Sequence, residues 1–200
     1  MIVSVERASR LLDAAQVVAY PTETVYGLGV DAASPAALDR LLALKGRPRE
    51  RGLSVLISDA AALDARVPDL PEAARTLARS FWPGPLTLVV PVRDGALAGV
   101  ATELGVGFRC SPHATAGALA RHAGRPLVAT SCNRSGGRPC VSADEVEAAF
   151  GPDLPIAGGE PAGGLQPSTV VAVDRDGTLS ILRQGSLAER ELRHCLEEVA

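Results

Sequence analysis

The chain has 200 residues, of which 46% are hydrophobic and 22% are charged, and its formal net charge is −3. This composition is ordinary for a soluble globular protein, whereas a general nucleic-acid coat protein would be strongly basic. The charged N-terminus lacks the pattern of a secretion signal, and no run approaches the roughly 18 apolar residues of a membrane span, so we expect a cytoplasmic protein with no membrane partner.

Helical and extended patterns are mixed along the whole chain. In chain order we predict a helix over 4–15, a strand over 17–20, a loop over 22–32, a helix over 34–44, a strand over 53–57, a helix over 71–81, strands over 86–92 and 106–110, a helix over 114–122, a strand over 126–131, a loop over 133–140, a helix over 142–150, a loop over 158–168, strands over 169–173 and 179–183, and a last helix. Ser34-Pro35 places a capping hydroxyl before a proline that suits the first helical turn. Asp176-Gly177 is typical of a hairpin turn, and Ser186-Leu-Ala-Glu189 fits a capping box for the last helix.

The order of these elements predicts the fold class. Several neighbouring strands have hairpin-length links, while helices separate others, which indicates an α/β (α+β) domain with a twisted, open, mixed sheet. The chain contains no internal repeat and no clear linker. We therefore expect a single domain over residues 1–200 and no additional C-terminal domain.

The four cysteines are Cys110, Cys132, Cys140 and Cys195. No two of them form a C-x-x-C pair, and no histidine completes a zinc-site spacing. We therefore predict reduced thiols, as is usual in the cytosol, and no structural metal bound by the protein.

The segment LKGRPRER (44–51) contains Lys45, the only lysine among 20 basic residues. Lysine offers a compact point charge, and Arg47 offers a planar fork that grips two oxygens at once. Both heads could therefore approach one anion, such as a phosphate. The alternative interpretation of this segment is a solvated basic turn, since basic residues suit a helix C-terminus.

Ser131 and Asn133 follow a predicted buried strand and precede two glycines. Side chains two residues apart in extended backbone point the same way, so this hydroxyl and amide could bind an anion or the polar edge of a nucleotide. A simple polar turn is the alternative. The chain has no G-x-x-x-x-G-K-[ST] phosphate loop and no G-x-S-x-G motif for a serine nucleophile.

Taken together, these segments resemble the YrdC family, and within it the bacterial TsaC-type threonylcarbamoyl-adenylate synthases. The resemblance covers nearly the whole chain, because YPTETVYGLGVDA, LKGRPRERGLSVLI, FWPGPLTLV, VGFRCSPH, LVATSCNRSGG, GGLQPSTVV and ILRQG follow in the family's order and spacing. The combination of PTETVYGLG, K-x-R and S-x-N is specific as a set. It implies a twisted open sheet, flanked by helices, around a large and positively lined cavity.

The resemblance implies an enzyme that condenses L-threonine, bicarbonate and ATP to threonylcarbamoyl-AMP and pyrophosphate. Downstream tRNA threonylcarbamoyl-transfer proteins would then use the product to modify an adenosine of tRNA. Mg²⁺ is expected on the ATP phosphates, although no carboxylate cluster indicates its ligands. Members of this kind are also described as binding double-stranded RNA, so tRNA or double-stranded RNA is a further expected partner.

The resemblance also implies a site, with no metal ligands of its own. The catalytic residues would be Lys45, Arg47, Ser131 and Asn133. The threonine-binding residues would be Thr22, Thr24, Arg109, Ser131 and Ser168. The nucleotide-binding residues would be Lys45, Arg47, Arg51, Asn133, Ser142 and Arg183, with Gly105 as a further contact.

Three positions depart from the family's pattern. Some members have a proline before the leucine of the K-x-R loop and, a few residues later, a histidine that helps to hold threonine, whereas Gly52 and Leu56 stand there in this chain. Cys132 replaces the usual alanine of S-A-N. Two alternatives stay open: an RNA-binding factor of the same fold without this chemistry, against which the scarcity of aromatics (3%) weighs, and a paralogue that uses a different acyl acceptor.

Overall fold

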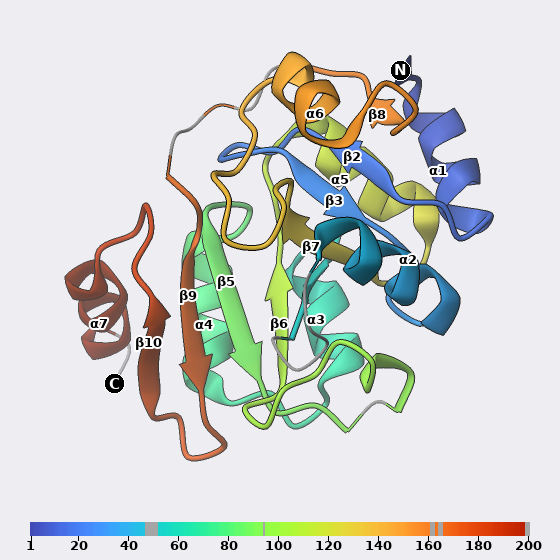
Figure 1. Cartoon of the computed structure of the whole chain (residues 1–200). Helices are drawn as coiled ribbons and strands as arrows, with labels where there is room; N and C mark the ends of the chain where they lie inside the picture. The colour runs from blue at the N-terminus through green and yellow to red at the C-terminus, as the bar shows by residue number, and fades with distance from the viewer. Residues whose placement is uncertain (47–51, 94, 161–162, 164–165, 199–200) are drawn as a thin grey trace.

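The computed structural model describes residues 1–46, 52–93, 95–160, 163 and 166–198. In this part of the chain, ten strands form one mixed sheet in the order β1-β8-β2-β3-β7-β4-β6-β5-β9-β10, with helices packed around it (Figure 1). The strands are β1 (Ile2–Val3), β2 (Val18–Tyr20), β3 (Gly27–Gly29), β4 (Ser54–Leu56), β5 (Leu86–Val90), β6 (Val106–Arg109), β7 (Leu127–Ser131), β8 (Ile156–Ala157), β9 (Thr169–Val173) and β10 (Leu179–Arg183). The helices are α1 (Val5–Asp13), α2 (Pro35–Lys45), α3 (Ala60–Arg66), α4 (Glu72–Phe81), α5 (Ala114–Ala123), α6 (Ala143–Phe150) and α7 (Glu189–Glu197), with a 3₁₀ turn η2 (Gly95–Leu97).

The sheet mixes parallel and antiparallel neighbours. β4 pairs parallel with β6 and antiparallel with β7, and β5 pairs antiparallel with β6 and parallel with β9. β9 and β10 form the predicted antiparallel hairpin, which lies at one edge of the sheet beside α7 (Figure 1). The prediction of an open, mixed α/β sheet is therefore confirmed.

Three helices begin where a serine hydroxyl caps them. The hydroxyls of Ser4, Ser34 and Ser142 each accept a hydrogen bond from the main-chain N–H three residues later. Such a cap satisfies an N–H that the first turn leaves without a helical partner, and contributes about 1 kcal/mol. α2 extends to Lys45, one residue further than predicted, and ends at Gly46, whose φ of 60° is left-handed and suits glycine.

The predicted last helix is present, but its predicted capping box at Ser186–Glu189 is wrong. α7 begins at Glu189, and the carboxylate of Glu191 accepts a hydrogen bond from the main-chain N–H of Ala188 at 2.7 Å. The Ser186 hydroxyl instead lies 3.3 Å from the main-chain carbonyl of Pro167, to which it donates. A tertiary contact with a distant loop therefore takes the side chain that the local motif assigned to a cap.

The predicted loop over 22–32 contains a strand, β3. This strand pairs antiparallel with β2 and β7, and the Tyr20 ring lies close against it. A Cβ atom on Gly27 would lie 2.8 Å from that ring, and one on Gly29 would lie 3.0 Å from it. These glycines therefore make room for an aromatic ring and do not form a turn.

Four further elements, α3, β1, β8 and the 3₁₀ turn η2, lie outside the predicted set. β1 and β8 have two residues each and pair parallel with one another across more than 150 positions. An element of two residues has no readable period, so its existence depends on the neighbouring strand rather than on its own sequence.

Helices are held to the sheet by two groups of buried apolar side chains. In one group, Leu12 of α1 and Leu119 of α5 are buried with residues of β2 and β7. In the other, Leu77 of α4 is buried with Leu88 of β5 and Phe108 of β6. Full burial of such a side chain contributes about 1.5–3 kcal/mol, which makes the central strands a firm base for the loops at their ends.

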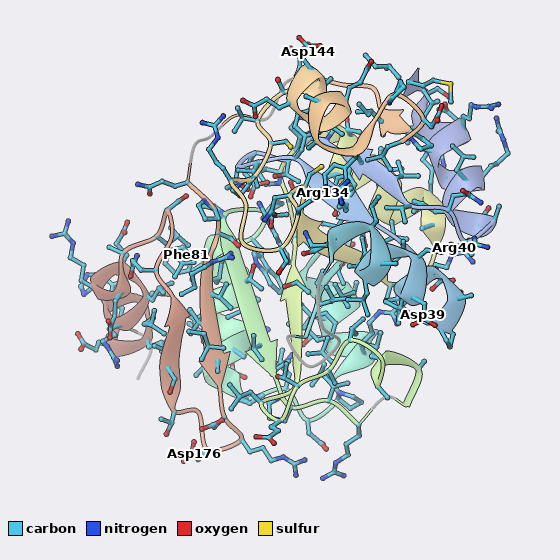
Figure 2. All side chains as sticks on the ribbon, in the orientation of Figure 1. Asp39, Arg40, Phe81, Arg134, Asp144 and Asp176 are labelled. Atoms are coloured by element: carbon cyan, nitrogen blue, oxygen red, sulfur yellow. The ribbon has the colours of Figure 1, made fainter. Side chains whose placement is uncertain are left out.

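Charged side chains gather at the periphery of the molecule. Asp39, Arg40, Asp144 and Asp176 are exposed and point away from the sheet (Figure 2). Within the described residues, no helix combines the length and the apolar character that crossing a membrane requires.

Candidate functional site

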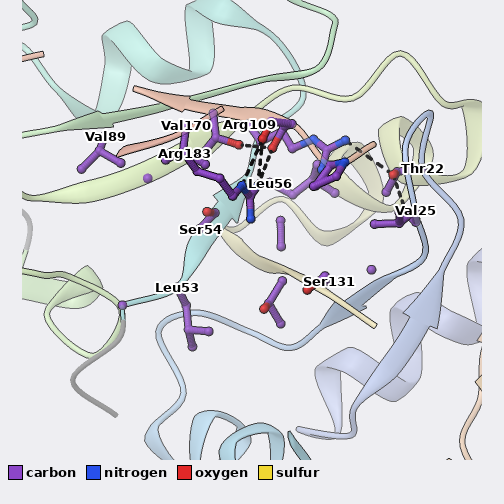
Figure 3. A pocket seen from close by; sticks show the side chains of 18 of the residues that line it. Thr22, Val25, Leu53, Ser54, Leu56, Val89, Arg109, Ser131, Val170 and Arg183 are labelled. Carbon is purple, nitrogen blue, oxygen red and sulfur yellow. Dashed lines mark hydrogen bonds between the residues drawn. The ribbon is translucent and has the colours of Figure 1, made fainter. Parts of the chain in front are cut away.

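A cavity of about 290 Å³ opens among the central strands of the sheet (Figure 3). Its wall includes the guanidinium residues Arg109 and Arg183 and many hydroxyl side chains. The serines and threonines of the wall are Thr22, Ser54, Thr87, Thr102, Thr130, Ser131 and Ser168. Among the lining residues that the structure describes there is no carboxylate, so this wall suits a polar, anionic ligand. Residues 47–51 lie outside the described part of the chain, and the positive charge of the whole lining stays a prediction.

Arg109 stands at the end of β6 and reaches the cavity wall (Figure 3). Its Nη2 lies 2.6 Å from Oε1 of Glu23, 2.6 Å from Oγ1 of Thr24 and, more weakly, 3.5 Å from Oγ1 of Thr22. Only 12% of the Arg109 side chain and 18% of the Glu23 side chain are exposed. Because charge-assisted hydrogen bonds are strong where water is excluded, these contacts fix the guanidinium in place.

The two threonines form a relay beside Arg109. Thr22 Oγ1 donates to the carbonyl of Val25 at 2.6 Å and lies 3.1 Å from Thr24 Oγ1. A hydroxyl carries a single proton, so Thr24 donates to Thr22 and accepts from Arg109. Both threonines are buried. The guanidinium orients the hydroxyl of Thr24, and the carbonyl of Val25 orients that of Thr22.

A second guanidinium, that of Arg183 at the end of β10, reaches the same cavity (Figure 3). Its Nη2 donates to the carbonyl of Ser168 at 2.9 Å and to the hydroxyl of Ser168 at 3.2 Å. The Ser168 hydroxyl also lies 2.9 Å from Oγ1 of Thr87 on β5. Ser168 directly precedes β9, so the hydrogen bonds from Arg183 tie the start of β9 to the end of the neighbouring β10.

Lys45, the last residue of α2, is 98% buried, and its side chain reaches the end of β7. Its ammonium group donates to the main-chain carbonyl of Ser131, in a short contact, and to that of Asn133 at 3.0 Å. The Ser131 hydroxyl donates to Oδ1 of Asn133 at 2.5 Å. Three residues that the sequence predicts to act together therefore meet, although only Ser131 is among the described residues that line the cavity.

This geometry gives a physical reason for a lysine at position 45. A compact ammonium with rotatable donors can serve two carbonyls of one bent segment, whereas the flat guanidinium fork of arginine presents its donors in one plane. The positive charge also sits in the last turn of α2, where the helix dipole favours it. The lysine thus joins the C-terminus of α2 to the end of β7.

The Asn133 amide shapes the loop that follows β7. Its Nδ2 donates to the carbonyls of Arg134 and Gly137 at 2.8 and 2.9 Å. Arg134, labelled in Figure 2, holds the same loop from outside, with its guanidinium 5.5 Å from the centre of the Phe150 ring on α6. Since the Asn133 side chain is engaged on both its oxygen and its nitrogen, it orients the Ser131 hydroxyl.

Two buried thiols close this loop. The main-chain N–H of Cys140 donates to the carbonyl of Cys132 at 2.8 Å, and the two side chains form a hydrogen bond. That bond, together with burial, raises the pKa of Cys132, and the same bond lowers the pKa of Cys140. All four cysteines carry free thiols.

The remaining predicted residues have different fates. Arg47 and Arg51 lie outside the described residues. The Ser142 hydroxyl caps α6 by accepting from the N–H of Glu145 at 3.2 Å, and Ser142 is not among the described lining residues. Gly105 lines the cavity with φ 116°, and a Cβ there would lie 2.0 Å from the carbonyl oxygen of Val90, so only glycine fits.

The wall also contains two of the positions that depart from the family's pattern. Leu56 is buried and lines the cavity, which makes this part of the wall apolar. Gly52 lines it with φ 51°, and a Cβ there would lie 2.3 Å from a methyl carbon of Thr102. Leucine at position 56 therefore presents an aliphatic side chain to the cavity, at a position where the resemblance implies a histidine in some members.

Sequence reasoning misses two residues of the Arg109 cluster. Glu23 pairs with Arg109, and its second oxygen, Oε2, accepts a hydrogen bond from the Ser111 hydroxyl at 2.5 Å. The available signal was the carboxylate between the two threonines of TET (22–24), but nothing local indicates a partner 86 positions away. In the described part of the chain, no group of three or more His, Cys, Asp or Glu side chains could hold a metal ion.

The family model described as "Telomere recombination" (Sua5/YciO/YrdC) matches residues 10–185. The chain belongs to the Sua5/YciO/YrdC family. This confirms the resemblance drawn from the sequence motifs, and the match includes every predicted site residue.

Relatives and solved structures agree with the family. A Serratia proteamaculans (strain 568) protein named threonylcarbamoyl-AMP synthase is 45% identical over 160 residues, which cover 78% of this chain and 84% of that protein. The structure of P. abyssi Sua5 complexed with L-threonine is 33% identical with a TM-score of 0.85, over 99% of this chain and 61% of that one, so this chain spans about three fifths of that Sua5 chain. E. coli YciO, at 23% identity and a TM-score of 0.80 over 92% of this chain and 90% of that one, supports the fold alone.

Proposed function

We propose that the protein is an L-threonylcarbamoyl-adenylate synthase, which converts L-threonine, bicarbonate and ATP to threonylcarbamoyl-AMP and pyrophosphate. The observation that carries this proposal is that Arg109, Arg183 and the Ser131 hydroxyl line one cavity in a chain that is 45% identical to a protein named threonylcarbamoyl-AMP synthase. The name of that relative also argues against an RNA-binding factor without chemistry.

The reaction needs positioning and charge neutralisation more than a protein nucleophile. The threonine amine attacks carbon dioxide formed from bicarbonate and loses a proton to give a carbamate. A carbamate oxygen then attacks the α-phosphorus of ATP, and the bond from that phosphorus to the pyrophosphate oxygen breaks. A wall of guanidinium and hydroxyl groups suits this chemistry, because preorganised donors stabilise charge that develops on phosphate oxygens and hold the two reactants together.

The threonine end of the site is assigned to the Arg109 cluster. Arg109 pairs with the threonine carboxylate, and the Thr22 hydroxyl completes the contacts at the wall. Thr24, which is not among the described lining residues, supports them through its hydrogen bond with Arg109. Ser131 and Ser168, which also line the cavity, bind the remaining polar atoms of threonine. Leu56 supplies apolar contact where other members use histidine.

The nucleotide end is assigned to the residues that follow α2, β7 and β10. Lys45, Arg47, Arg51 and Arg183 neutralise phosphate charge there. Asn133 and Ser142 orient the nucleotide and the loop that holds it. Lys45 acts from the end of β7, where it fixes the segment 131–133, so its role combines positioning with charge.

A magnesium ion would arrive with ATP. Because the described lining residues include no carboxylate, the ion would be held chiefly by phosphate oxygens and water, as Mg²⁺ commonly is, and it would neutralise charge on the leaving pyrophosphate. We propose that downstream proteins use the product to transfer the threonylcarbamoyl group to tRNA. Either tRNA or double-stranded RNA is also a direct partner of this chain. We place the reaction in the cytoplasm, where ATP and tRNA are available.

The test is the mass of the product. The full chain is incubated with ATP, Mg²⁺, bicarbonate and L-threonine, and pyrophosphate release and product mass are measured, with reactions lacking threonine or bicarbonate as controls. Threonine-dependent release of pyrophosphate together with a mass equal to threonylcarbamoyl-AMP is the expected result. If serine or another amino acid replaces threonine with higher kcat/KM, the protein is a paralogue with another acceptor; if no amino acid supports release, the proposal is wrong.

A further inference from the structure

The contacts of Glu23 place a carboxylate directly behind the arginine that is assigned to threonine. Its Oε1 lies 2.6 Å from Nη2 of Arg109, and its Oε2 accepts from the Ser111 hydroxyl at 2.5 Å. Both oxygens are therefore engaged, and Glu23 is not among the described residues that line the cavity. Glu23 therefore influences the position of groups at the cavity through its contact with Arg109.

Arg109 depends on this carboxylate because its head has few other anchors. Its hydrogen bonds to Glu23, Thr24 and Thr22 all start from Nη2. Nε is buried and has no hydrogen-bond partner in the described part of the chain. Glu23 is also the carboxylate with which Arg109 forms its ion pair, so loss of Glu23 would leave a largely buried cation held by hydroxyls alone.

We infer that Glu23 is a positioning residue for the amino-acid subsite: it holds Arg109 through Nη2, so that Nη1 faces the carboxylate of threonine. This inference rests on the proposed function. The Glu23–Arg109 pair has no net charge, which matches an amino acid that enters as a zwitterion. An arginine that is already ordered also loses little rotamer freedom when the substrate binds.

Two opposing effects decide the outcome when Glu23 is replaced. Removal of the carboxylate makes the subsite more positive, which alone would favour a substrate carboxylate. It also frees the guanidinium, which then has to be ordered at each binding event, and lets it turn towards other acceptors. Exposed and mobile ion pairs contribute little, whereas well-placed hydrogen bonds to charged groups contribute much more, so we expect the loss of position to dominate.

The experiment compares Glu23→Gln with wild type on two substrates: L-threonine and L-threoninamide, in which an amide replaces the carboxylate. Glu23→Gln should raise the KM for threonine about tenfold, the loss expected for one charge-assisted hydrogen bond, and leave the KM for ATP within about twofold. The preference for threonine over threoninamide, as the ratio of kcat/KM values, should shrink by about the same tenfold factor. A merely structural defect would lower kcat/KM equally for both substrates and leave this ratio unchanged.

Asp31→Asn is the matched control. The Asp31 side chain is 15% exposed, close to the 18% of Glu23, and it pairs with Arg125 at a place where neither residue is among the described lining residues of the cavity. This variant also loses one carboxylate from an ion pair, although Arg125 is 33% exposed and also pairs with Asp13. Its KM for threonine and its preference over threoninamide should equal those of wild type.

Ser111→Ala tests the same contact without removing a charge. It removes the hydrogen-bond donor to Oε2 of Glu23. It should raise the KM for threonine by about threefold and reduce the preference for threonine over threoninamide by the same factor. If thermal unfolding shows that Glu23→Gln does not fold, Ser111→Ala is the deciding variant. An unchanged or lowered KM for threonine in the folded variants, or an unchanged preference, overturns the inference. A wild-type chain that forms no product with threonine contradicts the proposed function instead.

Discussion

Two cationic clusters near the cavity, one around Arg109 and one around Lys45, are held in different ways. Arg109 is held by side chains of one loop, the Glu23 carboxylate and the Thr24 hydroxyl. Lys45 donates to main-chain carbonyls at the end of β7. A side-chain anchor can be removed by one substitution at a neighbour, but a carbonyl belongs to every residue. The position of Arg109 is therefore adjustable by mutation around it, whereas the position of Lys45 depends on the fold and on the lysine itself.

Lys45→Ala is expected to have the largest effect on activity. Removal of a preorganised donor from such a site typically costs roughly 10²–10³-fold in rate, so threonine-dependent pyrophosphate release should fall by about that factor. The two carbonyls that lose their donor should also lower the free energy of unfolding by about 1–3 kcal/mol. Steady-state kinetics and urea unfolding of the same preparation measure both effects.

Two variants on the same helix control this measurement. Lys45→Arg keeps the charge but cannot place a compact ammonium between the carbonyls, so it should also lose most of the activity. Arg40→Ala removes an exposed cation of α2 and should stay close to wild type. Full turnover in a folded Lys45→Ala variant would contradict the role of Lys45 in the site.

A double-mutant cycle of Glu23→Gln and Arg109→Gln should give the next largest effect, on stability. Each single variant leaves a largely buried charge without its partner, which costs about 3 kcal/mol. The double variant removes both charges and should cost clearly less than the sum, with a coupling of at least about 1 kcal/mol. Urea unfolding of the four proteins measures it, and additive losses would mean that the pair is not the anchor described above.

Gly27→Ala tests whether the two clusters share one support. Gly27 is paired with Ser131 across β3 and β7, and a Cβ there would meet the Tyr20 ring at 2.8 Å. Overpacking of this kind costs about 1–3 kcal/mol, and turnover should fall because β3 carries the 22–26 loop on one side and contacts β7 on the other. Gly95→Ala, whose Cβ would meet nothing within 4 Å, is the control and should change stability by less than about 0.5 kcal/mol; an equally stable Gly27→Ala would contradict the packing argument.

The smallest effect concerns pH and reports on Cys110, the residue after Arg109. Burial raises the pKa of this thiol from 9.0 to about 11. The unfolded chain therefore loses the proton first, so the stabilisation is complete below pH 9 and is lost as the pH rises towards 11. By linkage it amounts to on the order of 2 kcal/mol.

Urea unfolding between pH 8 and pH 11 checks this prediction. The difference in free energy of unfolding between wild type and Cys110→Ala should change over that interval. A pH-independent difference for Cys110→Ala would mean that the thiol ionises as readily in the folded protein as in the unfolded chain.

Prediction from sequence succeeded where the responsible contact is local. Ser34 caps its helix through an N–H three residues away, and the hairpin of β9 and β10 needs only the turn between them. It failed at Ser186, where a carbonyl of a distant loop accepts the hydroxyl's hydrogen bond. It also failed at β3, whose glycines are typical of a loop, because the sequence does not show that the Tyr20 ring packs against them.

The candidate site divides in the same way. Lys45, Ser131, Asn133 and Arg109 can be identified in the sequence, because the motifs that contain them are contiguous. Glu23 stands inside one of those motifs, yet its role depends on an ion pair with a residue 86 positions away. The sequence shows which side chains can donate or accept hydrogen bonds, but it does not show which distant residue a charged side chain will pair with.

By itself the sequence determined the starts of α1, α2 and α6, most of the alternation of helices and strands, the family and the kinds of side chain at the site. These follow from short-range hydrogen bonds, from hydrophobic periodicity and from motif spacing, all of which act within a few residues. Only the tertiary structure decided the order of the strands, the burial of Lys45 against two carbonyls and the pairing of Glu23 with Arg109. Those features arise when segments far apart in the chain exclude water from one another, and a buried charge must then find its partner wherever the sheet has brought one.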